Sequence, residues 1–307
     1  MPSNLDVLVA QFKDSLMAEL ELQQTASILS GTVLEGPLRG RHEAIPVAQK
    51  RSFREKQDKH QLLTPKEGVW RWRKADAKPA LDDVWFTDED QLRSSIVDYR
   101  QAFAQQMAYA AARWTDDLIL SALFGTAYEG ETEDSFSPVP FDSNPYVRSD
   151  KSGGMVLAED APEWKTVNAA LAALRENQND MSMVTFATTE RVWERFRADG
   201  ENQVWWNSSN AIASQLVNTG NIGNIYGLNV KIVESPFLDS TATSDNDTNY
   251  GVFYTKNAAK LLTVSDFQVE ARKPDTYANS RIIYAGLDKG CTRLIERGVF
   301  VVEFDLT

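Results

Sequence analysis

The segment QLRSSIVDYRQAFAQQMAYAAARWTDDLILSALF, residues 91–124, carries the strongest structural signal in the chain. Apolar residues recur in it every three or four positions, which predicts one continuous helical face. The members of this face are Leu92, Ile96, Tyr99, Phe103, Met107, Ala110, Trp114 and Leu118. Thr87 or Asp88 can cap the start, and Gly125 ends the pattern. We therefore predict a single helix over 88–125, about 50 Å long, with an alanine-rich side that another backbone can approach closely.

Charge is distributed unevenly around this helix. The 307-residue chain has a formal net charge of −12. Residues 39–79 hold twelve Lys or Arg against five Asp or Glu, a local balance of +7, so the rest of the chain carries −19. Three prolines interrupt this stretch and predict a long irregular segment. Phe53, Trp70 and Trp72 favour its burial against this chain or a neighbouring one, whereas the other interpretation is a solvated basic loop.

The remaining segments predict a mixed α and β chain. Residues 4–29 are amphipathic and predict a helix. Residues 126–160 are turn-rich, and helices alternate with strands from 162 to 233. Residues 238–250 predict an exposed polar loop, and residues 251–307 predict strands joined by turns. The fold class expected from this order is α+β, with the strands concentrated late in the chain.

The composition excludes several classes of protein. No apolar stretch reaches the roughly 20 residues that cross a bilayer, and Asp6, Asp14 and Glu19 are incompatible with a secretory signal. The single cysteine cannot form an internal disulfide, which fits a reducing cytoplasm. The acidic total opposes indiscriminate binding of nucleic acid. Two histidines leave little material for histidine-based catalysis or metal binding.

The search for chemical motifs finds no catalytic or cofactor site. Phosphate-binding GxxxxGK[ST], dinucleotide-binding GxGxxG, zinc-binding HExxH and nucleophile-elbow GxSxG are all missing from the sequence. Cys291 lies in a predicted strand and is interpreted as a small buried apolar residue. The run Asp245 to Asn249 alternates as in a calcium loop, but Tyr250 and Lys256 replace the glycine and the bidentate glutamate. We therefore predict no catalytic residue, no cofactor and no metal.

Three stretches late in the chain resemble a known family. They are IYGLNVKIVESPFL (225–238), YGVFYTKNAAKLLTVSDFQVEARKPD (250–275) and SRIIYAGLDKGCTRLIERGVFVVEFD (280–305). Their pattern, together with the order of a short helix, a basic segment, one very long helix and an α/β region, is similar to the tailed-bacteriophage major capsid protein. The fold is shared with encapsulins. The resemblance covers nearly the whole chain in the order of its elements.

The resemblance implies a division of the chain into functional regions. By analogy these would be an N-arm (1–38), an extended loop (39–87), a peripheral domain (88–162) with its spine helix (88–125), an axial domain (163–254) and C-terminal strands that complete the peripheral domain (255–307). It implies pentamers and hexamers in an icosahedral shell that encloses double-stranded DNA without sequence specificity. The implied partners are copies of the chain, a separate scaffold protein and a portal. The implied location is the virion, assembled in the host cytoplasm, with no membrane and no enzymatic activity.

The basic segment supplies the candidate interface between subunits. In capsids of this kind the extended loop lies across the adjoining subunit, and a basic arm against an acidic remainder is complementary for a head-to-tail contact. Trp70 and Trp72 are the candidate anchors, and the further candidates are Arg51, Phe53, Arg54, Arg71 and Arg73. Two alternatives remain open at this point: an encapsulin-like compartment shell, and an intracellular α/β enzyme with its site in 163–254.

Overall fold

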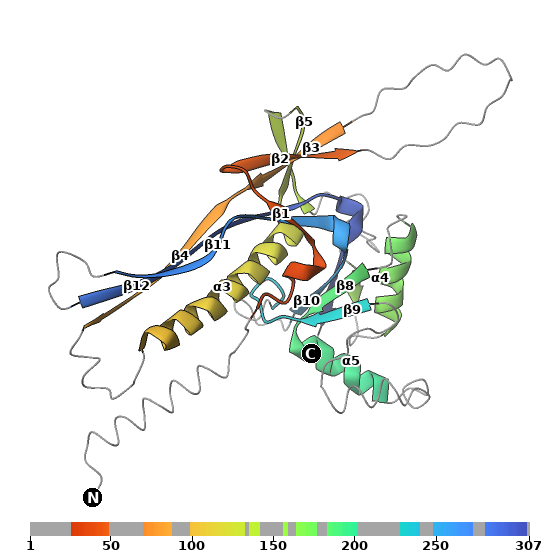
Figure 1. Cartoon of the computed structure of the whole chain (residues 1–307). Helices are drawn as coiled ribbons and strands as arrows, with labels where there is room; N and C mark the ends of the chain where they lie inside the picture. Colours follow the sequence, from red (N-terminus) through yellow and green to blue (C-terminus); the bar gives the residue numbers. More distant parts are fainter. Residues whose placement is uncertain are drawn as a thin grey trace, which may run out of the picture.

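The computed structural model describes most of the chain (Figure 1). The described residues are 26–48, 70–87, 99–132, 135–141, 156–158, 164–176, 183–201, 228–239, 248–272 and 280–305. They form three sheets and one long helix, α3 (Tyr99–Phe124), which runs along two of the sheets.

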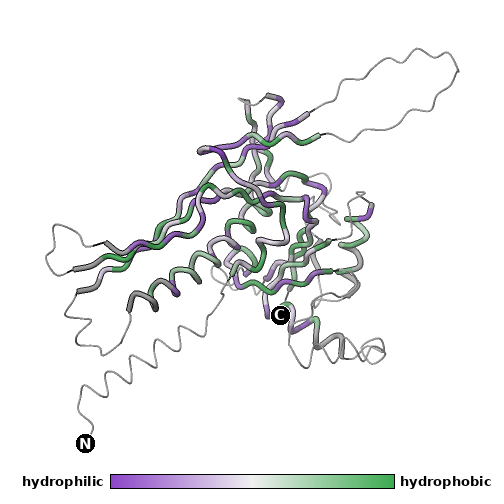
Figure 2. The backbone as a smooth tube through the Cα atoms, in the orientation of Figure 1, coloured by the Kyte–Doolittle hydropathy of each residue, from purple (hydrophilic) through white to green (hydrophobic). Residues whose placement is uncertain are grey.

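The first sheet, here the long-strand sheet, projects to the left in Figure 1. Its order is β1-β11-β12-β4, with bounds Leu34–Pro37, Ala259–Arg272, Ser280–Arg293 and Lys78–Thr87. β11, β12 and β4 pair antiparallel, whereas β1 is parallel to β11 and covers only its first residues. Figure 2 shows the alternation of hydrophobic and hydrophilic residues along these strands. That alternation is expected for a sheet with one covered face, and the covered face meets the first half of α3.

The second sheet, here the central sheet, has five strands in the order β7-β13-β10-β8-β9. Their bounds are Val156–Ala158, Val299–Asp305, Thr248–Thr255, Val184–Thr188 and Leu228–Ile232. Every residue of β8 is buried, as expected for a strand covered on both faces. Helices α4 (Trp164–Glu176) and α5 (Glu190–Glu201) cover one face, and the second half of α3 covers the other.

Alternation along the central strands builds two cores. Val252 and Tyr254 of β10 pack toward Leu118 to Leu123 of α3. Phe253, between them, packs on the opposite face, where its ring stacks on Phe186 with 4.2 Å between centroids. The alternation of side chains along β10 therefore lets one strand pack against α3 on one face of the sheet and against α4 and α5 on the other.

The third sheet, here the hairpin sheet, lies at the top of Figure 1. Its order is β2-β3-β5-β6, with bounds His42–Ala48, Trp70–Asp76, Ala127–Thr132 and Ser135–Val139. β5 follows directly after the end of α3, so the hairpin of β2 and β3 is attached to the spine of the molecule through its neighbour strand. Short 3-10 turns lie at Ser30–Thr32 (η1), Lys256–Ala258 (η4) and Glu296–Gly298 (η5).

Several predicted elements are confirmed, and others need correction. The long helix is confirmed over Tyr99–Phe124, while 88–98 lies outside the described residues. The prediction that 39–79 is irregular is wrong where it can be compared, because β2, β3 and the first residues of β4 lie within it. β3 and β4 are hard to recognise because β5 and β12, with which they pair, are distant in sequence, and β2 is separated from its partner β3 by residues 49–69. Residues 26–29, the end of the predicted first helix, are not helical, and residues 4–25 lie outside the description.

The assignment of 255–307 to the peripheral domain stays a prediction, and in the structure β13 pairs with β10 in the central sheet. The predicted exposed loop 238–250 begins and ends in buried structure, because Leu238 and Asn249 are both fully buried. Asn249 accepts a hydrogen bond from Thr189 (3.0 Å) and lies in β10, so it is not part of an open calcium loop. Asp245 lies outside the described residues.

Candidate assembly surface

The two faces of the hairpin sheet differ in character. Residues directly opposite each other in antiparallel strands share a face, and the register pairs Trp70 with Ala48 and Trp72 with Pro46. On the next strand, Trp72 pairs with Gly130. The outward face is therefore built from tryptophan, proline, alanine and glycine around Trp70 and Trp72, and Lys74 with its partners Ala44 and Tyr128 lies further along the same face. The inward face carries the arginines.

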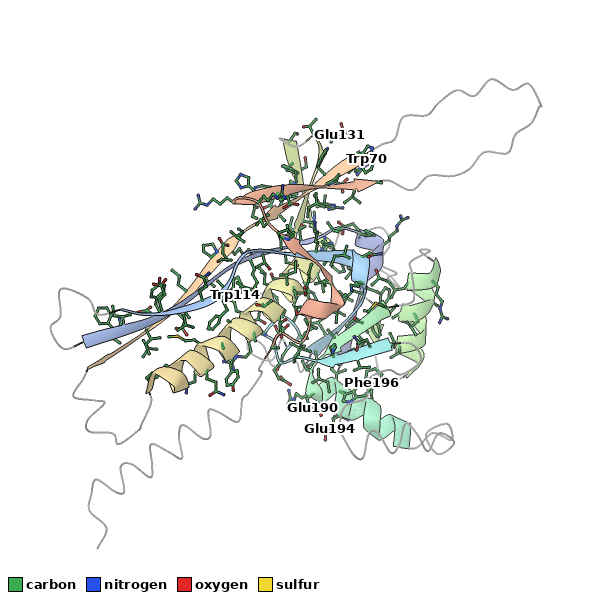
Figure 3. The ribbon with its side chains drawn as sticks, in the orientation of Figure 1. Trp70, Trp114, Glu131, Glu190, Glu194 and Phe196 are labelled. Carbon is green, nitrogen blue, oxygen red and sulfur yellow. The ribbon has the colours of Figure 1, made fainter. Side chains whose placement is uncertain are left out.

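The outward face is apolar and open. Trp70 is 55% exposed and Tyr128 is 44% exposed, and Figure 3 shows Trp70 on the hairpin sheet well away from the central sheet. Gly130 has no room for a side chain, because an added Cβ would lie 2.0 Å from the Ser135 carbonyl oxygen. The flank of Trp72 is consequently left without a covering side chain from β5. Exposed aromatic side chains gathered on one face are typical of a binding surface.

The inward face carries ionic groups that become buried toward the body of the molecule. Arg73 is only 5% exposed, and its Nη2 lies 2.6 Å from Glu129 Oε2 and 2.8 Å from Glu296 Oε1. Arg71, next along the face toward solvent, also pairs with Glu129. Glu129 comes from β5 and Glu296 from η5, so the arginines of β3 contact two other elements of the same chain.

Arg293 extends this series of ion pairs from Glu296 to the end of α3. This residue is fully buried, and its Nε donates to Glu296 Oε2 at 2.5 Å. Its Nη1 donates to the carbonyl oxygens of Leu123 (2.8 Å) and Gly125 (2.7 Å), which have no partner within the helix. Its guanidinium lies 5.0 Å from the ring centroid of Phe141. Burial lowers the pKa of Arg293 while Glu296 raises it. Arg293 thus acts as the C-terminal cap of α3, at the negative end of the helix dipole.

The predicted interface residues divide into three groups. Arg51, Phe53 and Arg54 lie outside the described residues. Trp70 and Trp72 lie on the outward face, and their role as an interface stays a prediction, while Arg71 is half exposed on the inward face. Arg73 is the correction: it is buried and paired within its own chain, so it is not free to bind a neighbour.

Sequence reasoning missed several residues of this region. Tyr128 joins the open face through pairing with Lys74, and a turn-rich stretch gave no sign of that register. Arg293 gave a usable signal, because it is the one charged residue in the strand segment CTRLI and an arginine in a buried strand requires partners. Glu129 and Glu296 could be found only once the strands were placed.

Two consecutive carboxylates of α3 attach other segments of the chain. Asp116 accepts hydrogen bonds from the Ser27 hydroxyl (2.6 Å) and from the backbone N–H groups of Ile28 (3.1 Å) and Leu29 (2.9 Å). Asp117 accepts a hydrogen bond from the Ser235 hydroxyl at 2.5 Å. Burial raises the pKa of Asp117, and the Ser235 hydrogen bond opposes that shift. The helix therefore fixes both the entering chain and the segment after β9.

The described residues contain no cluster of three or more His, Cys, Asp or Glu side chains that could hold a metal ion. Cys291 lies in β12 as predicted, and burial raises the pKa of its thiol to about 12. Such a thiol is almost entirely protonated at neutral pH and is a poor nucleophile. None of the described helices is both long enough and apolar enough to span a membrane.

The hairpin sheet thus combines an ionic base with an open aromatic face, and exposed aromatic side chains of this kind are typical of a binding surface. The family model described as phage capsid protein matches residues 6–306, so the chain belongs to the phage capsid protein family. The predicted resemblance to tailed-phage major capsid proteins is thereby confirmed. The chain is a structural capsid protein, and the alternatives of a cargo compartment or an enzyme are not favoured.

Solved structures agree on the fold. The capsid of cyanophage Pam1 matches with a TM-score of 0.67 and 11% identity, covering 91% of this chain and 92% of that one. The capsid of the native GTA particle matches with a TM-score of 0.64 and 15% identity, covering 92% and 91%. The capsid of Ralstonia phage GP4 matches with a TM-score of 0.63 and 14% identity, covering 90% and 87%. No curated protein matches the sequence significantly.

Proposed function

We propose that copies of this chain assemble into the pentamers and hexamers of an icosahedral phage head that encloses double-stranded DNA. The observation that carries the proposal is the family match over residues 6–306. The open aromatic face of the hairpin sheet supports it independently, because a single copy leaves that face in water. We assign the chain no catalytic role.

The outward face of the hairpin sheet is the proposed contact between copies. Trp70, Trp72 and Tyr128 are its anchors, since large aromatic side chains supply most of the binding free energy in interfaces of this kind. Arg51, Phe53 and Arg54 extend the contact along the same hairpin in sequence. Such a contact joins different surfaces of neighbouring copies, and a heterologous contact of this type closes into rings.

The regions of the capsid fold follow the sheets in this proposal. The N-arm is 1–38, the extended loop is the hairpin of β2 and β3, and α3 with the long-strand sheet forms the peripheral domain. The axial domain is the central sheet with α4 and α5, and it takes β13 from the C-terminal stretch. The proposed partners are a separate scaffold protein, a portal and the packaged DNA, which a chain of net charge −12 would not grip tightly. Assembly takes place in the host cytoplasm, and the product is the virion.

Electron microscopy of purified particles tests the proposal. The chain is expressed alone and with its neighbouring reading frames, and closed shells built of pentamers and hexamers are expected. DNA-filled heads with a tail vertex identify a virus, whereas closed shells filled with an enzyme would identify a compartment. A chain that stays a soluble monomer under every condition would contradict the proposal.

A matched pair of tryptophan variants tests the contact. Trp70→Ser removes an anchor of the outward face, and shells are expected to be lost or far fewer. Trp85→Ser removes a tryptophan of similar exposure (52%) from β4, on a different sheet, and shells are expected to form. Equal loss in both variants would show that the hairpin face has no special role.

A further inference from the structure

The hairpin sheet is held to the body by an alternating series of five charged side chains, here called the ion chain. From the surface inward its members are Arg71, Glu129, Arg73, Glu296 and Arg293. The N to O distances along its inner part are 2.6, 2.8 and 2.5 Å. Each carboxylate lies between two guanidinium groups, so every neighbour in the series has the opposite charge.

The ion chain connects three separate parts of the fold. Arg73 belongs to the hairpin, Glu129 belongs to the strand that follows α3, and Glu296 belongs to the turn between β12 and β13. Arg293 then joins that turn to the last carbonyl groups of α3. A single guanidinium, that of Arg73, therefore faces both the extension of the helix and the C-terminal turn.

The burial of the ion chain indicates what it contributes. Buried ion pairs add little net stability compared with apolar packing, but they are directional and accept few geometries. The apolar contact beside it is a small cluster that includes Ile45 and Ala75 of the hairpin and Leu262 and Leu294 of the body. Apolar packing is not directional, so this cluster alone does not select one angle between the hairpin and α3.

We propose that the ion chain is the joint that sets the angle between the hairpin sheet and α3, with Arg73 as its central positioning residue. The consequence for assembly rests on the proposed function: the joint determines where the outward face of the hairpin sheet meets the next copy. Each seven-residue strand of the hairpin is about 20 Å long, so a tilt of about 15° at its base moves the far end by about 5 Å. A displacement of that size would misplace Trp70 at the contact.

Distance measurement by pulsed electron paramagnetic resonance tests the joint without requiring assembly. Nitroxide labels are placed at Ala48 on the hairpin and at the exposed Arg113 on α3, in a full-length chain that carries Cys291→Ser. The dispersed chain is expected to give one narrow distance distribution. Arg73→Met is expected to broaden it or shift it by about 5 Å. Lys74→Met, which removes the neighbouring cation paired with Asp76 on the surface, is expected to leave it unchanged.

A multiple variant separates positioning from simple stabilisation. Arg73→Met combined with Glu129→Gln removes one cation and one carboxylate together, while Glu296 keeps its pair with the buried Arg293, so it is the form expected to fold well. The proposal expects its distance distribution to stay broad even when its unfolding midpoint recovers.

A narrow distribution at the original distance, in either the single or the multiple variant, would overturn the proposal that the ion chain sets this angle. Failure of the unaltered chain to form shells, with the narrow distribution intact, would instead contradict the proposed function and leave the joint standing.

Discussion

Replacing Arg293 with methionine tests how the end of α3 is held. Methionine keeps most of the side-chain length, so the change removes the charge and its donors without opening a large cavity. The side chain donates to Glu296 and to the carbonyl oxygens of Leu123 and Gly125, all within 2.8 Å. Breaking a buried ion pair costs about 3–5 kcal/mol. Glu296 keeps Arg73 as a partner, which favours the lower end of that range.

The carbonyl groups of Leu123 and Gly125, left without their donor, add to the loss of stability. Each buried polar group left without a partner costs about 1–3 kcal/mol, although some carbonyl oxygens near a helix end find water instead. We therefore expect Arg293→Met to lower the free energy of unfolding by about 4 kcal/mol, a large part of the 5–15 kcal/mol of a typical native protein. Urea unfolding followed by circular dichroism measures the difference.

Two control variants sharpen the result. Arg175→Met removes an exposed arginine from α4 and is expected to change the stability by less than about 0.5 kcal/mol. Arg293→Lys keeps a charge for Glu296 but lacks the planar fork that serves several acceptors, so it is expected to recover only part of the loss. A loss below about 1 kcal/mol in Arg293→Met would refute the view that this residue caps the helix.

Three further predictions concern buried groups. Gly251→Ala places a Cβ 2.7 Å from two phenylalanine rings and is expected to cost about 1–3 kcal/mol in urea unfolding, whereas Gly31→Ala, with open space around it, is expected to be tolerated. Cys291 has a pKa of about 12, so its thiolate fraction at pH 8 is roughly a thousandfold below that of the unfolded chain. A thiol reagent is therefore expected to modify the native chain far more slowly than the unfolded one, and equal rates would contradict the raised pKa. The raised pKa of Asp117 means that the native chain keeps a proton which the unfolded chain has already lost. The free energy of unfolding, relative to that of Asp117→Asn, should therefore fall as the pH rises from about 4. A difference between the two chains that stays constant between pH 4 and 7 in urea unfolding would contradict the raised pKa.

The elements with strong local patterns were predictable. The long helix has an apolar face with a helical period and ends at a glycine, and both signals lie within the segment itself. The late strands were also recognised, because their alternating or continuous apolar runs are bounded by turns. The two long strands β11 and β12 were read as shorter pieces, since each contains polar residues where it passes out of the core.

The pairing of elements was not predictable in the same way. β3 reads as a basic, irregular stretch because its inward arginines look like solvent-exposed residues until Glu129 and Glu296 are placed beside them. The same stretch revealed its outward anchors, Trp70 and Trp72, because tryptophan in a polar segment is conspicuous in any register. Sequence reasoning therefore named the two tryptophans of the outward face, whose role as an interface stays a prediction, and did not foresee that Arg73 is paired within its own chain.

The internal pairing of Arg71 and Arg73 changes which cations are expected to make assembly depend on salt. The +7 of residues 39–79 includes Arg71 and Arg73, which are matched by carboxylates of their own chain, so they contribute little to attraction between copies. Residues 49–69 retain six Lys or Arg against three Asp or Glu and are the main source of any steering charge. Shell assembly is expected to weaken as salt rises to about 0.3 M, where charges in water are screened beyond about 6 Å.

Variants distinguish the two sources of charge. Arg51→Gln with Arg54→Gln is expected to flatten the dependence of the assembly rate on salt, measured by light scattering. Arg71→Gln removes one charge instead of two, at a side chain already paired with Glu129, and is expected to leave the slope nearly unaltered. An effect of Arg71→Gln at least half as large as that of the double change would show that pairing with Glu129 does not keep the Arg71 charge from contributing to assembly. Assembly that is insensitive to salt would show that the aromatic face alone brings the copies together.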